Sequence, residues 1–347
     1  MARSGRVTLS DIAERLDLTK VSVSKALRDH PDISTQTKER VKKLAQEMGY
    51  APNRLARSLT TDKTGTLGII VPKIAHTFFA DALAGISEVA TANEYEIVLC
   101  VSEERADFEQ RHLRTLLSMR VDGLLVSVTE ETNDPGVFTA LQDQGVPLVF
   151  FDRALNGVGA STVTVDDEGG AYQAVEHAVR KGCRDIAHVG GFSHVGIGAK
   201  RRRGYERALC DHGIPVRDEW IVEGGFDEQH GYRGFKQLLN AERLPEVIFA
   251  VTFPVALGVT DAMKQVDPAL QDDIQIYSFG QHGLNRFFAY PHVSVYQPAR
   301  ELGKQGVQIL LEEIDDPDRA PSHVELETHV IEPTDETYPP YLNGRDG

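Results

Sequence analysis

The stretch that decides the fold is residues 8–27, TLSDIAERLDLTKVSVSKAL, near the amino terminus. Its first apolar residues, Ile12, Ala13 and Leu16, recur at the spacing that places them on one face of a short helix. The pattern then breaks, and Thr19 is a favourable N-cap for a second helix. Two short helices joined by a turn predict a helix-turn-helix.

A third helix completes a small all-α domain over residues 1–50. Either Ser34 or Thr35 can cap this helix, and Gly49 ends it, because glycine is common just past helix ends. The inward side chains are then apolar in both later helices: Val23, Ala26 and Leu27 in the second, and Val41, Leu44, Ala45 and Met48 in the third.

The outward face of the second helix suits DNA. Lysines at 20 and 25 can donate to guanine, and Val21 can contact a thymine methyl group in the major groove. No acidic side chain lies on this helix, and hydroxyl groups that suit phosphate oxygens surround it: Thr19, Ser22, Ser24 and Thr35. The alternative is a three-helix protein-interaction module with a hydroxyl-rich surface.

Residues 51–59, APNRLARSL, predict a further helix of about two turns. Helices this short are marginal in water, so we expect this one to fold only when DNA holds it. Paired copies in a dimer can enter the minor groove, with Leu59 as a wedge between base steps and Arg54 or Arg57 near phosphates. A plain linker would more often be rich in glycine, serine or proline.

Charge is divided unevenly along the chain. The whole chain carries 37 Lys/Arg and 52 Asp/Glu, a net charge of −15. Residues 1–63 hold 13 of the basic and 8 of the acidic residues (+5), which leaves 24 basic and 44 acidic residues (−20) for the other 284. A small basic end on a large acidic body is typical of a head that binds polyanions.

Composition excludes several protein classes. Hydrophobic residues at 41% and charged residues at 26% are ordinary for a globular protein, which excludes wholesale disorder, collagen-like repeats and a disulfide scaffold. The three cysteines, Cys100, Cys183 and Cys210, form no CxxC pair, which favours buried thiols in a reducing compartment over the alternative of a disulfide bridge or a metal site. No run of about 18 apolar residues occurs. We therefore expect a cytoplasmic protein without a membrane span.

After residue 66 the pattern alternates between short apolar strands and helices. The expected strands are 67–71, 97–101, 123–128, 147–151, 163–165, 186–189, 221–222, 247–251 and 274–279. Such alternation predicts parallel sheets covered by helices on both faces. A single sheet does not readily hold this many strands. We expect two α/β lobes with a ligand at the carboxyl ends of their strands.

Three motifs make the chain resemble the lactose-repressor (LacI/GalR) family of bacterial transcription regulators. They are TLSDIA at 8–13, VSVSKAL at 21–27 and GYAPNRLARSL at 49–59. The resemblance implies that the second helix reads the major groove and that the hinge leucine opens the centre of a palindromic double-stranded operator. Lys25 departs from it, since arginine is common at that position. The predicted DNA contacts are Thr8, Thr19, Lys20, Val21, Ser22, Ser24, Lys25, Thr35, Tyr50, Asn53, Arg54, Ala56 and Leu59.

The resemblance also implies a two-lobed, periplasmic-binding-protein-like core. We expect the hinge and linker at 51–63 and the core at 64–347. The first lobe would hold about 64–162 and 292–322, and the second about 163–291 and 323–347. The end of the chain lacks a leucine heptad, so the tetramerising tail of some relatives is not expected and a homodimer is.

Effector contacts are implied at five places in the core, on loops that follow strands or in nearby helices. Alternatives stay open, because Phe79 can be a core residue, Asp152 and Arg153 can form an ion pair between lobes, and the basic residues around Arg201 can be solvated. The predicted effector contacts are Phe78, Phe79, Asp152, Arg153, Arg201, Phe226 and Gln281.

Two departures from the family bear on the effector. Relatives often carry Asn-Asp where this chain has Thr252 and Phe253, and Asp where it has Gly280. Fewer carboxylates remain to hold sugar hydroxyls, which favours an effector that is more apolar, acidic or held mainly by arginines over a simple neutral hexose. The expected class is a sugar, sugar acid, sugar phosphate or nucleoside-like molecule.

Enzyme motifs are absent from the sequence. Residues 191–195, GFSHV, lack the last glycine of GxSxG, and no HExxH or Walker A pattern occurs. We expect no catalysis, cofactor or metal, and interpret the protein as a repressor of catabolic genes controlled by a small molecule. The alternatives are a corepressor-dependent regulator of biosynthetic genes, a solute-binding module, or an enzyme with a DNA-binding-like head.

Overall fold

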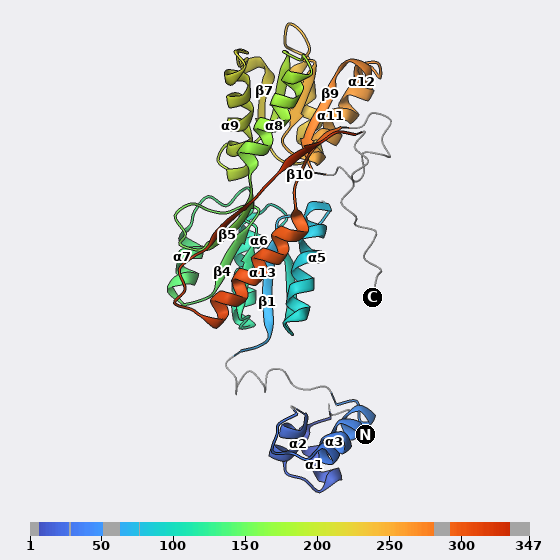
Figure 1. Ribbon diagram of the computed structural model, residues 1–347, viewed down its shortest axis with the longest axis vertical. Coiled ribbons are helices and arrows are strands. Elements are labelled where there is room, and N and C mark those ends of the chain that lie inside the picture. Colours follow the sequence, from blue (N-terminus) through green and yellow to red (C-terminus); the bar gives the residue numbers. More distant parts are fainter. Residues whose placement is uncertain (1–6, 28, 51–62, 76, 281–291, 334–347) are drawn as a thin grey trace. The chain divides into compact units, whose positions relative to one another are not determined.

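The computed structural model describes residues 7–27, 29–50, 63–75, 77–280 and 292–333 (Figure 1). The chain divides into two compact units, Met1–Thr64 and Gly65–Gly347, which we call the head and the core. Among the described residues, no helix is long and apolar enough to cross a membrane.

The head is the predicted three-helix unit. It consists of α1 (Leu9–Leu16), α2 (Lys20–Leu27) and α3 (Thr35–Glu47) around a buried cluster of small and β-branched side chains. The side chain of Asp11 accepts hydrogen bonds from the backbone N and the hydroxyl of Thr8 at 2.7 and 2.8 Å, which fixes the start of α1. Ser34, not Thr35, caps α3. The helix-turn-helix prediction is confirmed.

The first lobe of the core contains a six-stranded parallel sheet in the order β11-β5-β4-β3-β1-β2. Strands β3 and β4 are buried throughout, since helices cover both faces. Its strands are β1 (Thr66–Val71), β2 (Glu96–Val101), β3 (Gly123–Val126), β4 (Leu148–Phe151), β5 (Ser161–Val165) and β11 (His323–Leu326), and its helices are α5 (Thr77–Ala92), α6 (Ala106–Ser118), α7 (Gly136–Asp143) and α13 (Ala299–Asp315).

The second lobe repeats this plan with the order β12-β10-β9-β8-β6-β7, in which only β12 runs antiparallel to its neighbour among the described strands. Its strands are β6 (Ile186–Gly191), β7 (Ile221–Gly224), β8 (Val247–Ala250), β9 (Gln275–Phe279), β10 (Val293–Tyr296) and β12 (His329–Ile331). Its helices are α8 (Asp167–Arg180), α9 (Gly196–Asp211), the 3-10 turn η1 (Asp218–Trp220), α10 (Glu228–Leu238), α11 (Phe253–Val266) and α12 (Leu270–Asp273).

The chain passes between the lobes at three places that differ by a few residues from the predicted ones. Strand β5 pairs with β4 in the first lobe, so the first passage follows residue 165 instead of 162. Strand β10 pairs with β9 in the second lobe, and β11 pairs with β5 in the first, so the other passages follow residues 296 and 326 instead of 291 and 322. Apolar runs identify strands but not their pairing partners, which explains the error.

Helices α10 and α11 of the second lobe pack with their backbones in close contact. A side chain at Gly231 in α10 would place its Cβ 2.0 Å from the carbonyl oxygen of Val255 in α11. Gly258 in α11 meets the carbonyl oxygen of Glu228 in the same way, at 1.9 Å. The pair therefore packs backbone against backbone, which holds the loops before α10 and α11 in place.

Candidate DNA-binding surface and effector site

Helix α2 presents the residues that were expected to read DNA. Val23 and Ala26 are fully buried, whereas Val21 is 65% exposed and Lys20 is exposed beside it. The hydroxyl of Thr19 accepts a hydrogen bond from the backbone N of Ser22 at 3.0 Å and caps the helix. Because most of the Val21 side chain is exposed, it contributes little to the packing of the head and is available to contact a base.

Lys25 is engaged within the head. Its Nζ lies 2.7 Å from a carboxylate oxygen of Asp32, in the loop between α2 and α3. The hydrogen bond from Lys25 lowers the pKa of Asp32, so the carboxylate is charged at neutral pH. DNA must therefore compete with Asp32 for this lysine.

We predict that Asp32→Asn strengthens DNA binding by a factor of about two to five, because it removes an exposed competing charge. Fluorescence anisotropy with a labelled duplex measures the change. Asp29→Asn is the control, since Asp29 pairs with Lys42 at 2.7 Å outside α2. Equal gains from both variants would mean that only net charge matters, and would contradict a specific competition for Lys25.

The other predicted DNA contacts fall into two groups. In the first group, Thr8 is bonded to Asp11, Thr35 is exposed at the start of α3, and Tyr50 packs partly against the buried cluster of the head. Ser24, also in this group, is half-buried in α2. The remaining four lie outside the described residues: Asn53, Arg54, Ala56 and Leu59.

In the core, the carboxyl ends of the two sheets meet at what we call the interlobe junction. Asp152 and Arg153 follow β4 directly, and Asp152 adopts a φ of 61°, which is uncommon outside glycine. Contacts between the lobes include the His194 ring N, 2.9 Å from the carbonyl oxygen of Glu130. Carboxyl ends of parallel strands are where α/β proteins bind ligands, so this junction is the candidate effector site.

Arg153 joins the two lobes. Its Nη1 donates to both carboxylate oxygens of Glu104 in the first lobe, at 2.8 and 3.0 Å. Its guanidinium carbon lies 4.7 Å from the centre of the Phe226 ring in the second lobe. Arg153 is 7% exposed. Three of the predicted effector contacts, Asp152, Arg153 and Phe226, therefore lie close together.

Arg201 points into the second lobe and is paired there. Its Nε and Nη2 donate to Asp167 at 2.9 and 2.7 Å, and its guanidinium carbon lies 3.7 Å from the centre of the Phe279 ring. Its third partner is the carbonyl oxygen of Val251. Arg201 is 2% exposed and Asp167 1%. The basic neighbours of Arg201 in α9 are not merely solvated either, since all three form ion pairs: Lys200, Arg202 and Arg203.

The aromatic residues expected to border the effector are largely core residues. Phe79 is 4% exposed and packs edge-on against Phe151, with ring centres 6.4 Å apart. Phe78 is half-buried beside it. Gln281 lies outside the described residues.

The junction holds carboxylates in places of low solvent access. Burial raises the pKa of Asp152 to about 6, against the opposing effect of the Arg153 guanidinium. Burial also raises the pKa of Glu130, and the nearby Glu104 carboxylate adds to this shift. Keeping the Asp152 and Glu130 carboxylates charged therefore costs free energy unless a hydrogen-bond donor or a cation contacts them.

Several junction residues were missed from the sequence. Each one follows the carboxyl end of a strand or begins the next helix, so the rule that identified Asp152 would have found them if applied to every strand. They are Lys73 after β1, Glu104 after β2, Glu130 after β3, Asp167 at the start of α8 and Asp227 after β7.

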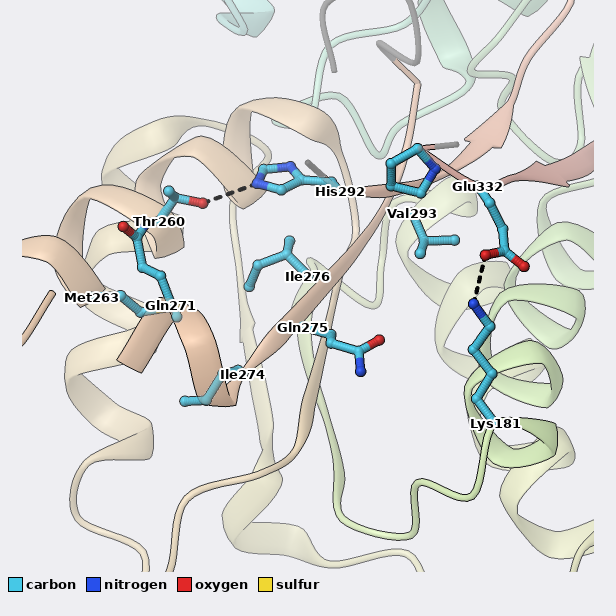
Figure 2. A pocket seen from close by; sticks show the side chains of 11 residues that line it. Lys181, Thr260, Met263, Gln271, Ile274, Gln275, Ile276, His292, Val293 and Glu332 are labelled. Atoms are coloured by element: carbon cyan, nitrogen blue, oxygen red, sulfur yellow. Dashed lines mark hydrogen bonds and ion pairs between the residues drawn. The ribbon is translucent and has the colours of Figure 1, made fainter. Parts of the chain in front are cut away.

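A separate groove of about 310 Å³ lies at the amino ends of β9 and β10 (Figure 2). The ion pair of Lys181 with Glu332 borders one side, and the hydrogen bond of Thr260 with His292 borders the other. Because α/β ligands bind at the carboxyl ends of strands, this groove is not the candidate effector site.

Comparison with known families matches both parts of the chain. The model described as "Periplasmic binding proteins and sugar binding domain of LacI family" matches residues 64–333, and "Bacterial regulatory proteins, lacI family" matches residues 8–53. The catabolite control protein A of Priestia megaterium is 32% identical over 308 residues, 88% of this chain and 91% of that protein. The ribose operon repressor of Haemophilus influenzae is 28% identical over 94% of this chain and 96% of its own length.

Solved structures of transcription regulators resemble this chain over most of its length. A cellobiose complex of the transcriptional regulator CelR is 25% identical with a TM-score of 0.70, covering 94% of this chain and 99% of that one. The Lac repressor dimer bound to operator and the anti-inducer ONPF has a TM-score of 0.82 at 22% identity, covering 94% of this chain and 98% of that one. At that identity the second likeness supports the fold alone.

Proposed function

This chain belongs to the LacI family of bacterial regulatory proteins, and we propose that it represses genes of carbohydrate or related catabolism under the control of a small molecule. Its family makes it a DNA-binding transcriptional regulator. The catabolite control protein and the ribose operon repressor among its relatives support carbohydrate metabolism as the regulated process.

One observation carries the proposal. A folded head exposes Lys20 and Val21 on a helix without acidic residues, in the same chain as a two-lobed core whose junction holds buried charged groups from both lobes. A solute-binding module or an enzyme has no use for such a head. We assign no catalytic role, and we place the regulator in the cytoplasm with the DNA that it binds.

The control follows from linkage between the two sites. Contacts such as Arg153 with Phe226 and Lys73 with Asp227 favour one arrangement of the lobes. An effector that favours another arrangement of the lobes changes the affinity for the operator, and the operator changes the affinity for the effector by the same factor. The coupling free energy is typically about 1 to 3 kcal/mol. The same head and core can respond to an inducer, which weakens operator binding, or to a corepressor, which strengthens it. Titration of the operator in the presence and absence of the effector distinguishes the two.

We infer that the regulator acts as a homodimer on an inverted-repeat operator, with one head on each half-site. Two hinge segments then meet over the operator centre, where Leu59 can enter the minor groove. Leu59 lies outside the described residues, so this role rests on the sequence alone.

The hinge role predicts that Leu59→Ala weakens operator binding at least about tenfold, because the wedge no longer opens the central base step. Anisotropy titration gives the affinity, and sedimentation establishes that the variant has the same oligomeric state. Leu55→Ala serves as the matched control on the same segment. Unchanged operator affinity in Leu59→Ala would remove the wedge from the proposal.

The proposal as a whole is tested by selecting bound duplexes from a random DNA library with the purified full chain. We expect the enriched sequences to be inverted repeats. Enrichment of single half-sites would contradict the dimer, and no enrichment at all would contradict sequence-specific regulation.

A further inference from the structure

We propose that His30 in the head controls how strongly Lys25 binds DNA, because the protonated imidazole becomes a second partner of Asp32. Operator binding is then expected to strengthen as the pH falls from about 8 to about 6, the range in which histidine side chains gain charge. This inference deepens the proposed function and rests on it, since it adds a positioning residue to the DNA-binding surface. His30 is the only histidine within residues 1–63.

One carboxylate oxygen of Asp32, Oδ2, lies beside two side chains. The Nζ of Lys25 is 2.7 Å from it, and the Nδ1 of His30 is 3.4 Å from it. Nδ1 accepts a hydrogen bond from the backbone N of Asp32 at 3.3 Å, so in this arrangement it carries no proton to donate to Oδ2. Among the described residues, Lys25 is then the cation that balances this carboxylate.

The backbone keeps His30 beside this pair. The backbone N of His30 donates to the carbonyl oxygen of Lys25 at 3.0 Å, and that of Asp29 donates to the carbonyl oxygen one residue further on at 3.3 Å. Asp29 has a φ of 54°, the left-handed conformation that commonly ends a helix, and Pro31 restricts the φ after His30. The imidazole therefore lies just past the carboxyl end of α2, where the helix dipole favours a positive charge.

Protonation of His30 converts Nδ1 from an acceptor into a donor. The new N–H can donate to Oδ2 of Asp32, and the backbone N of Asp32, an exposed residue, can bond to water instead. When Lys25 moves to a phosphate or a guanine, Asp32 then still has a cation beside it. Without that cation, the carboxylate would be left unpaired close to the DNA phosphates, which is unfavourable. DNA binding and protonation of His30 therefore favour each other.

The other charged groups at this loop form a separate set. Lys42 pairs with the Asp29 carboxylate at 2.7 Å, and Lys38 donates to the carbonyl oxygen of Asp29 at 2.9 Å. Arg28 lies outside the described residues. Among the residues that are described, the charged groups that face His30 are thus Lys25 and Asp32. Because Asp29 carries the same charge as Asp32 but bonds to other lysines, it is the matched control position.

The test measures the affinity of the full chain for its selected inverted repeat by fluorescence anisotropy at pH 6, 7 and 8 and constant ionic strength. Between pH 8 and 6, the wild type is expected to gain at least about threefold more affinity than His30→Gln, because each of two heads contributes one exposed charge interaction. His323→Gln, at an exposed position of the core, should gain as much as the wild type. Calorimetry at pH 7 in two buffers of different ionisation enthalpy should show that His30→Gln takes up fewer protons on binding than the wild type does.

A double-mutant cycle tests the role of Asp32. Adding His30→Gln to Asp32→Asn is expected to change the pH dependence little, whereas adding it to Asp29→Asn should remove as much as in the wild type. Parallel pH profiles for the wild type and His30→Gln would overturn the inference. An equally large effect of His30→Gln in Asp32→Asn would also overturn it, since His30 would then act on the DNA directly. Specific binding with parallel profiles leaves the proposed function standing, whereas binding to no duplex at any pH contradicts both.

Discussion

Replacing Arg201 with methionine is expected to lower the free energy of unfolding of the core by about 3 to 5 kcal/mol. The variant leaves the carboxylate of Asp167, which is 1% exposed, without its counter-ion and both of its hydrogen bonds. It also removes the cation from the face of the Phe279 ring. Urea unfolding of the full chain, followed by tryptophan fluorescence of Trp220 in the core, gives the value.

Two further variants separate this structural role from effector binding. Adding Asp167→Asn to Arg201→Met removes the stranded charge and is expected to recover part of the loss. Arg203→Met is the control, since Arg203 is 56% exposed in its pair with Glu168, and should cost less than about 1 kcal/mol. If Arg201→Met loses less than about 1 kcal/mol while the effector response disappears, Arg201 acts as a direct effector contact and the buried-pair account fails.

The second large effect concerns pH and the buried His188. Burial lowers its pKa to about 4, and its ring is stacked between Tyr205 and Phe249 while Nδ1 bonds to the Phe249 carbonyl oxygen. Between pH 6.5 and 4, His188 is protonated in the unfolded chain but stays neutral in the native protein. Stability is therefore lost as the pH falls from about 6.5 towards 4, by about 3 kcal/mol from this residue.

The comparison with His188→Phe isolates this contribution. The variant keeps an aromatic ring between Tyr205 and Phe249 but does not titrate, and all carboxylates are common to both proteins. Its unfolding free energy should fall by about 3 kcal/mol less than that of the wild type between pH 6.5 and 4. His323→Gln, at an exposed position of β11, should show the wild-type dependence. Parallel pH profiles for His188→Phe and wild type would contradict the assignment.

The head was predictable because its signals are local. Capping residues, a break after Leu16 and inward Val23 and Ala26 are all properties of neighbouring residues in sequence, and the structure confirms the helices that they indicate. The alternation of apolar strands and helices likewise predicted two parallel-rich lobes. The three passages between lobes were misplaced by a few residues, since strand pairing is a long-range property.

The junction was only half predictable for the same reason. The position of Asp152 and Arg153 after a strand indicated their end of the sheet, but not that Arg153 reaches Glu104, which lies 49 residues earlier. The partner of Arg201 is Asp167 on another helix, so its charge was interpreted as open to an effector. Knowing a residue's place in the fold does not give its ion-pair partner.

The central claim is that the head binds an inverted-repeat duplex and that the core sets its affinity. The most direct measurement is the affinity of the full chain at physiological salt for its selected inverted repeat and for a scrambled duplex of equal length, with and without a small molecule that raises the unfolding temperature of the core. We expect at least about a thousandfold preference for the inverted repeat, and a change of at least about fivefold in operator affinity when the small molecule is added. Equal affinity for both duplexes, in the presence and absence of the small molecule, would contradict the claim.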